Sequence, residues 1–208
     1  NKRHTNVILG NKTKTIYGSG TIHDSIGSLT FHISAQSFFQ VNSEQAQRLY
    51  ETALDFADLK GGEIVADVYC GTGTITLFLA QKAKQVYGIE IVDSAIRDAV
   101  RNAKDNKIGN AQFILGDASI NCPNSSVTRP ARRHRLRSAS CRMRRTRLKS
   151  HRQQQTKTRR LRLVQPGNLG PRPGYLNDHG YHTKKVQPVD MFPRTHHVEA
   201  VALITREK

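Results

Sequence analysis

The chain has few cysteines and no long apolar run, which argues against disulfide-bonded, metal-binding and membrane-spanning proteins. Its three cysteines, Cys70, Cys122 and Cys141, show neither the paired spacing of metal ligands nor a disulfide framework. We therefore expect a reducing, cytoplasmic setting and no bound metal. No apolar run approaches the length needed to cross a bilayer, so we expect no membrane contact.

The first residues carry no targeting signal. Asn1–Thr5 has neither an initiator methionine nor the apolar core of a signal peptide, which predicts a fragment truncated at its N-terminus. The 208 residues suffice for one domain with a core, or for a domain with a tail.

Residues 119–174, called the basic segment below, contain no Asp, Glu, Phe, Tyr or Trp. They hold 16 Lys and Arg and so carry +16 of the formal net charge of +17. Such a charge is typical of proteins that bind nucleic acid, but here it is confined to one stretch and not spread over a folded face. Two interpretations follow: a basic nucleic-acid-binding protein, or an enzyme interrupted by a segment of foreign character.

The first third of the chain predicts short strands and then a helix. Asn6–Gly10, Thr15–Gly18 and Leu29–Ser34 are β-branched or alternating stretches that favour a small meander. Asn42 followed by Gln45 predicts a helix start, and a glycine pair at 61–62 predicts its end. The helical spacing of apolar residues predicts a buried face made of Ala46, Leu49, Tyr50, Ala53 and Ala57.

Strands and helices then alternate. Strands are predicted at 63–68, 85–91 and 112–115, and helices at 74–81 and 93–105. This alternation predicts an α/β fold with a parallel, doubly wound sheet. After the basic segment, 185–191 and 197–205 predict two more strands, as an antiparallel pair at the end of that sheet.

A glycine loop joins the first of these strands to its helix, in the string Asp67-Val-Tyr-Cys-Gly71-Thr-Gly73-Thr74. Gly71 and Gly73 allow a ligand to approach the backbone, and the helix N-terminus favours negative charge. Glu90 closes the next strand, where a carboxylate can accept hydrogen bonds from ribose hydroxyls. The loop has G-x-G and lacks the longer G-x-G-x-x-G of dinucleotide sites, which favours S-adenosylmethionine. Asp117, after strand 112–115, is placed to reach the adenine end; the alternative is a purely structural glycine turn.

Four strings together resemble the RNA (uracil-5-)-methyltransferases, and most closely the branch that acts on 23S rRNA. They are Ser37-Phe-Phe-Gln-Val-Asn42, the glycine loop, Gly88-Ile-Glu90, and Asp190-Met-Phe-Pro-Arg-Thr-His-His-Val-Glu199. The resemblance covers most of residues 1–118 and 175–208. It implies a Rossmann-like methyltransferase sheet and RNA as the partner, with rRNA favoured over tRNA.

The resemblance also implies roles for single residues. By position, the S-adenosylmethionine site would be lined by Gln40, Tyr69, Thr74, Glu90 and Asp117. Glu199 would be the general base that removes the C5 proton of uracil; the alternative is a surface acid on an edge strand. The neighbouring histidines 196 and 197 do not suit a metal, because adjacent residues of a strand face opposite sides.

Two strings that the family requires are absent. The family supplies a cysteine thiolate, which adds to C6 of uracil, from S-C-N-P-A-T-L-A-R-D, and an acid near the base from D-P-P-R. Cys141, in Ser140-Cys-Arg-Met143, matches neither string. Both strings are permitted by the codons of the basic segment when the reading frame is shifted by one nucleotide, over 164–174 and 137–145 respectively. We therefore interpret the basic segment as frameshifted, with an extra base near Ala118 and a lost base near Gly174.

This interpretation predicts an enzyme that is inactive as encoded. The basic segment should form no packed element, which leaves the central sheet incomplete with an exposed edge. The expected organisation is a small β region (1–41), the cofactor-binding half (42–118), the irregular basic segment (119–174) and the C-terminal strands (175–208). No methyl transfer and loose or absent cofactor binding should follow. The alternative is a non-catalytic, Arg-rich RNA-binding protein with salt-dependent binding.

Overall fold

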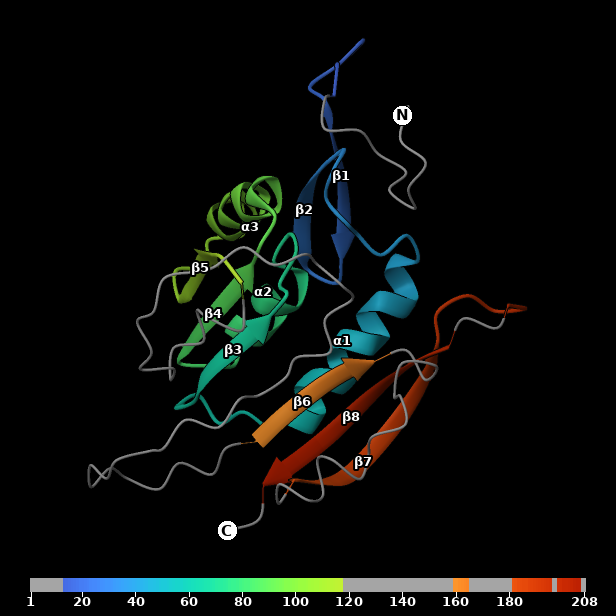
Figure 1. Cartoon of the computed structure of the whole chain (residues 1–208), viewed down its shortest axis with the longest axis vertical. Helices are drawn as coiled ribbons and strands as arrows, with labels where there is room; N and C mark the ends of the chain where they lie inside the picture. Colours follow the sequence, from blue (N-terminus) through green and yellow to red (C-terminus); the bar gives the residue numbers. More distant parts are fainter. Residues whose placement is uncertain (1–12, 118–158, 165–180, 196–197, 207–208) are drawn as a thin grey trace, which may run out of the picture.

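The computed structural model describes residues 13–117, 159–164, 181–195 and 198–206 (Figure 1). These residues form three helices and eight strands in three sheets. The strands are β1 (Thr21–Ile26), β2 (Leu29–Ser34), β3 (Ile64–Val68), β4 (Gln85–Glu90), β5 (Ala111–Leu115), β6 (Arg159–Val164), β7 (Tyr181–Asp190) and β8 (Val198–Arg206). The helices are α1 (Ser43–Ala57), α2 (Thr74–Ala80) and α3 (Asp93–Asp105).

β1 and β2 form an antiparallel hairpin that begins the described part of the chain. Alternate residues of β2 are buried, namely Leu29, Phe31 and Ile33, as the alternating sequence predicts. The predicted strand at Thr15–Gly18 is wrong, because these residues form turns and bends. Gly18 and Gly20, with φ of 76° and 73°, turn the backbone there. The predicted strand at 6–10 lies outside the described residues.

α1 begins where the sequence predicts. The side chain of Asn42 accepts a hydrogen bond from the backbone N–H of Gln45 and so caps the helix N-terminus. The five residues of the predicted face are buried, and Leu54 joins them. The helix ends earlier than the glycine pair at 61–62, because Asp58 takes a left-handed conformation with φ of 47° and its N–H bonds to the carbonyl of Leu54.

β3, β4 and β5 form a parallel sheet in the order β3-β4-β5, with α2 and α3 as the two crossovers. This confirms the predicted α/β alternation. Among the described residues, no strand pairs with the other edge of β3, and Ile64 on that strand is 69% exposed. Within the described residues this edge of β3 is therefore unpaired.

β7 and β8 are antiparallel, as predicted, but they do not extend the parallel sheet. They belong to a separate sheet of order β6-β8-β7, in which β8 is central. β6 also departs from the expectation that the basic segment contains no packed element. Its sequence, Arg-Arg-Leu-Arg-Leu-Val, alternates charged and apolar residues over four positions, and a short alternating stretch of this kind pairs readily with a strand.

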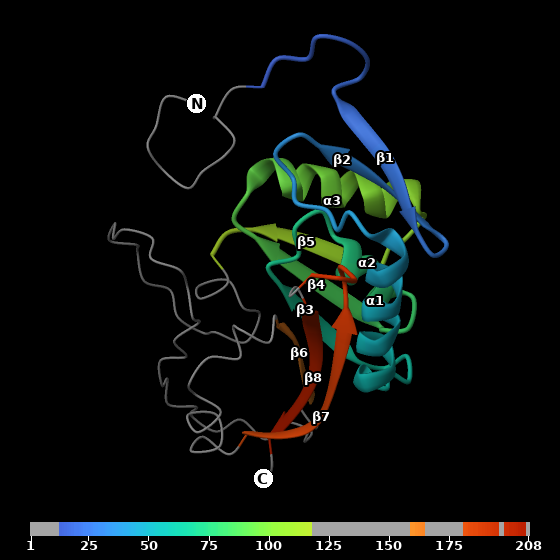
Figure 2. The same ribbon diagram turned by 90° about the vertical axis from the view of Figure 1, so that its right-hand side faces the viewer.

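α1 connects the two halves of the molecule, since it lies against the β6-β8-β7 sheet and also against β1 and α2 (Figure 2). Its buried face shares one core with the hairpin, α2 and the C-terminal strands. Met191 and Val201, both fully buried, belong to that core, as do Phe31 and Leu77. The C-terminal sheet is therefore joined to the rest of the molecule through the buried face of α1.

Candidate cofactor-binding site

The glycine loop forms a tight turn at the carboxyl end of β3. The backbone N–H groups of Tyr69 and Cys70 both donate to the carbonyl of Ile89 on β4, at 2.8 and 3.0 Å. Gly73 N–H donates to the carbonyl of Cys70 at 2.8 Å. Tyr69 has φ of 78°, which is a strained conformation for a residue with a side chain. Strain of this kind concentrates where a loop is shaped for a ligand.

The two loop glycines serve different purposes. A Cβ on Gly71, with φ of 55°, would meet no atom within 4 Å. A Cβ on Gly73, with φ of 85°, would lie 3.1 Å from Ala99 and from the ring of Phe113. Gly73 is thus required by packing between the loop, α3 and β5, whereas Gly71 borders open space.

Glu90 ends β4 beside the loop. One carboxylate oxygen, Oε2, accepts the N–H of Gly71 at 3.2 Å. The other, Oε1, accepts the N–H groups of Ile91 and Val92 at 2.7 and 2.9 Å. An acid held next to a glycine loop, with its oxygens fixed by backbone donors, is the arrangement that binds ribose hydroxyls in open α/β sheets.

Asp67, at the start of the glycine-loop string, is held from behind by α2. Its Oδ2 accepts the hydroxyl of Thr76 at 2.6 Å, and Thr76 is fully buried. The pKa of Asp67 is raised to about 6, chiefly by burial; the hydrogen bonds from Thr76 oppose this rise and the nearby charge of Glu90 adds to it. Thr76 was not predicted as a site residue; its hydroxyl, between apolar neighbours in a short helix, is the signal that could have found it.

Tyr50 of α1 lies beside the glycine loop. Its hydroxyl lies 3.3 Å from the hydroxyl of Thr74, the first residue of α2. Burial raises the pKa of Tyr50 to about 12, and the charges of Asp67 and Glu199 contribute in the same direction. Glu199, half-buried on β8 opposite Val189, therefore lies within electrostatic reach of the same phenol as the glycine loop. From sequence, Tyr50 is indistinguishable from the apolar residues on its helix face.

Asp117 and Gln40 are the two predicted site residues that remain. Asp117 is exposed and follows β5, where Gly116 N–H donates to the carbonyl of Glu90 at 2.8 Å. Gln40 is half-buried between β2 and α1. Two residues further on, Asn42 caps α1 and also donates through Nδ2 to the carbonyl of Met191 at 2.9 Å. That bond joins the string at 37–42 to the string at 190–199, which are 149 residues apart at their contact.

Cys70 cannot act as a nucleophile in this arrangement. The thiol is buried, with 5% of the residue exposed, and burial raises its pKa above the ordinary value for cysteine. A Cβ on Gly88 would lie 2.9 Å from its sulfur, so the thiol is packed against β4. Cys122, Cys141 and the histidines 196 and 197 lie outside the described residues. Within the described ranges, no cluster of three or more His, Cys, Asp or Glu is arranged to hold a metal ion.

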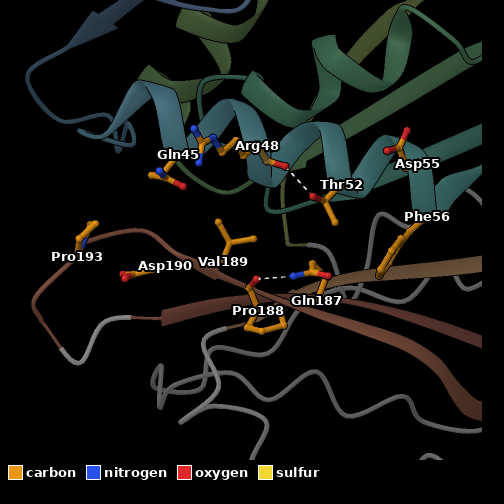
Figure 3. A pocket seen from close by; sticks show the side chains of 10 residues that line it. All are labelled: Gln45, Arg48, Thr52, Asp55, Phe56, Gln187, Pro188, Val189, Asp190 and Pro193. Atoms are coloured by element: carbon orange, nitrogen blue, oxygen red, sulfur yellow. Dashed lines mark hydrogen bonds between the residues drawn. The ribbon is translucent and has the colours of Figure 1, made fainter.

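A separate open groove runs between α1 and β7 (Figure 3). None of the predicted site residues lines it. Its walls include Arg48 and Thr52 of α1 and Gln187 and Pro188 of β7, and its polar groups bond partly to one another: Thr52 donates to the carbonyl of Arg48. The groove follows from helix-on-sheet packing and does not reach the glycine loop.

In the described part of the chain, no helix combines the length and apolarity required to cross a bilayer.

A parallel sheet with a glycine loop after its first strand and an acid after its second defines the Rossmann-like class of S-adenosylmethionine-dependent methyltransferases. Solved structures of that class share the fold. The tRNA (uracil-54, C5)-methyltransferase of Pyrococcus abyssi, solved with S-adenosyl-L-homocysteine, superposes with a TM-score of 0.65 at 20% identity, over 99% of this chain and 49% of that one. TYW2 of M. jannaschii, solved with AdoMet, gives 0.54 at 18% identity, over 93% and 90% of the two chains.

Sequence comparison identifies the family. The family model of tRNA (uracil-5-)-methyltransferases matches residues 11–133. An uncharacterized RNA methyltransferase of Halalkalibacterium halodurans is 46% identical over 98% of this chain, and one of Bacillus cereus is 44% identical over 99%. This chain belongs to the tRNA (uracil-5-)-methyltransferase family, as its motifs predict. It spans 45% of the length of each of these two relatives.

Proposed function

We propose that the chain is the catalytic-domain part of an S-adenosylmethionine-dependent RNA methyltransferase that acts at C5 of uracil. The observation that carries this proposal is the shared edge at which the site residues lie. The glycine loop follows β3, Glu90 ends β4 and Asp117 follows β5, and these three strands are neighbours in one parallel sheet. In open α/β sheets, ligands bind at this carboxyl edge.

The space beside the glycine loop supports the fit between the predicted residues and S-adenosylmethionine. A Cβ at Gly71 would meet no atom within 4 Å, so there is open space at this position. The Glu90 carboxylate lies next to that space, because it accepts the N–H of Gly71. Glu90 would accept the ribose hydroxyls, and Asp117 would lie towards the adenine end. Tyr69, Gly73, Thr74 and Gln40 would complete the lining. Because this loop is formed, we expect binding to survive in the chain as encoded, in contrast to the loose or absent binding expected from the sequence.

The transfer itself needs a thiolate that no described residue supplies. Methylation at C5 requires a cysteine thiolate to add to C6 of uracil, so that C5 can attack the sulfonium methyl group. A base, here Glu199, then takes the C5 proton, and the thiolate leaves. Cys70 is excluded because its thiol is buried and points into β4. We infer that the frameshifted basic segment removed the nucleophile and that the chain as encoded transfers no methyl group.

The test compares two chains. The chain as encoded and a version with the shifted frame restored over 119–174 are incubated with methyl-labelled S-adenosylmethionine and a uracil-containing rRNA fragment; a tRNA serves as the second substrate. We expect label in RNA only with the restored chain, and loss of that label in Glu199→Gln. Transfer by the chain as encoded, abolished by Glu199→Gln, would overturn the frameshift interpretation. Absence of transfer by the restored chain on both RNAs would overturn the uracil assignment.

One observation favours a different class of function. The +16 charge of the basic segment can neutralise phosphates, so an Arg-rich RNA-binding protein is the alternative. Such binding falls steeply with salt and is indifferent to sequence. If the chain as encoded binds RNA of any sequence with a steep salt dependence and binds no S-adenosylhomocysteine, the alternative is favoured.

A further inference from the structure

One buried carboxamide connects the β1–β2 hairpin to the glycine loop. Asn102 of α3 is fully buried. Its Oδ1 accepts the backbone N–H of His32 at 2.7 Å, and its Nδ2 donates to the carbonyls of His32 and Thr72 at 3.2 and 3.0 Å. Thr72 lies between the two loop glycines and is itself buried.

Asn102 is the middle member of a polar row along α3. Asp98 accepts the N–H of Ser34 at 3.1 Å, and Asn106, just after the helix, both accepts from and donates to the backbone of Thr30, at 3.0 and 2.7 Å. α3 lies alongside β2 (Figure 2), and three of its side chains, four residues apart, bond to the outer edge of β2 as a partner strand would.

The geometry explains why the row fits. Four residues of an α-helix advance about 6 Å, and two residues of a strand advance about 6.6 Å. Side chains at 98, 102 and 106 therefore meet every second residue of β2, whose N–H and C=O groups point away from β1. Each of the three makes one bond beyond the hairpin: Asp98 accepts the hydroxyl of Ser37, Asn106 donates to the carbonyl of Asn102, and Asn102 donates to the carbonyl of Thr72 in the glycine loop.

We propose that Asn102 is a positioning residue for the cofactor loop. The carbonyl of Thr72 and the N–H of Gly73 belong to one planar peptide group. Asn102 holds the carbonyl end, and the carbonyl of Cys70 accepts from the N–H end. Fixing this plane fixes the left-handed backbone of Gly73 and the start of α2. The β1–β2 hairpin thereby supports the glycine loop indirectly, through Asn102.

The test compares Asn102→Ala with the matched control Asn106→Ala in the full chain. Asn102→Ala removes two hydrogen bonds to the β2 backbone and the bond to Thr72. Asn106→Ala also removes two bonds to the β2 backbone, and one to the carbonyl of Asn102, but it leaves the Thr72 bond in place. Amide hydrogen exchange should accelerate at Gly73 in Asn102→Ala, about tenfold for a loss near 1.4 kcal/mol, and should stay at the unmodified rate in Asn106→Ala. Equal exchange at Gly73 in the two variants overturns the proposal. If far-UV circular dichroism shows Asn102→Ala to be unfolded, Asn102→Ser, which leaves room for a water, is compared by the same readout.

A second readout rests on the proposed cofactor site. Calorimetry with S-adenosylhomocysteine should show about tenfold weaker binding for Asn102→Ala and unchanged binding for Asn106→Ala. Equal weakening in both variants would make Asn102 merely structural and overturn the proposal. If the unmodified chain binds none of this ligand, the cofactor assignment fails, while the exchange comparison still decides the positioning role.

Discussion

Substitution of single glycines by alanine separates backbone strain, packing and ligand access in the loop. Gly61, Gly71 and Gly73 all have positive φ, of 90°, 55° and 85°. A left-handed conformation costs an alanine about 1–2 kcal/mol, and the stiffer unfolded chain returns about 0.4–1 kcal/mol of that. Gly61→Ala and Gly71→Ala should therefore each lower the free energy of unfolding by about 1 kcal/mol.

Gly73→Ala should cost more, because its Cβ would press on Ala99 and Phe113 at 3.1 Å. Overpacking of a close-packed site adds about 1–3 kcal/mol, for a total near 2–4 kcal/mol. Urea unfolding followed by far-UV circular dichroism measures the three losses, with an unchanged slope as the sign that the unfolded state is comparable. A loss for Gly73→Ala no larger than that for Gly61→Ala would refute the packing argument.

Gly71→Ala tests the site directly. Its stability should match that of Gly61→Ala, since a Cβ at either position meets no atom within 4 Å. Its affinity for S-adenosylhomocysteine should nevertheless fall, because the methyl group occupies the space beside the Glu90 carboxylate. Unchanged affinity in calorimetry would place the ligand elsewhere.

Three further outcomes are expected. Asn42→Ala should lower the free energy of unfolding, measured in urea, by about 1–3 kcal/mol, because it loses both the α1 cap and the bond to Met191. Asn42→Ser can still cap the helix and should lose less. Equal losses in the two variants would contradict the double role of Asn42. Asp67 has a pKa of about 6 in the folded protein, above its unfolded value near 3.9, so the folded state holds the proton more tightly and the free energy of unfolding falls as pH rises between these values. Asp67→Asn should remove that fall, and urea midpoints at pH 4.5 and 7 that shift equally in both proteins would contradict it. Cys70 should resist iodoacetamide in the native protein and react in urea, as followed by mass spectrometry; rapid native labelling would show the thiol to be accessible.

Much of the fold follows from local sequence patterns. The start and buried face of α1, the bounds of α3 and the strand–helix alternation from β3 to β5 were predictable, because capping and periodicity act within a few residues. A strand was wrongly predicted at Thr15–Gly18, since this stretch has the composition of a strand but no partner among the described residues. β1 was not predicted, because it has only two apolar positions. Strand formation depends on the partner strand, which local composition does not reveal.

The site was predictable where a motif marks it and not where tertiary contacts make it. Glycine spacing and the acid after β4 located the loop, and the structure brings Gly71 and Glu90 into hydrogen-bond contact. Tyr50 and Asn102 were missed because their bonds join segments 24 and 30 residues apart. The row of polar residues at 98, 102 and 106, in a helix whose other inward positions are alanine, was the available signal. The assignment of the C-terminal strands to the parallel sheet failed because strand order is set by packing on α1.

The route of the chain through the row on α3 has a consequence for synthesis. His32, Thr72 and Asn102, and the strands β3 to β5 around them, all lie before residue 117. Domains fold largely from the N-terminal end as the ribosome delivers them. The braced loop can thus assemble while the basic segment is still being translated. The frameshift proposed for residues 119–174 therefore removes the nucleophile and leaves the glycine loop and Glu199 in place.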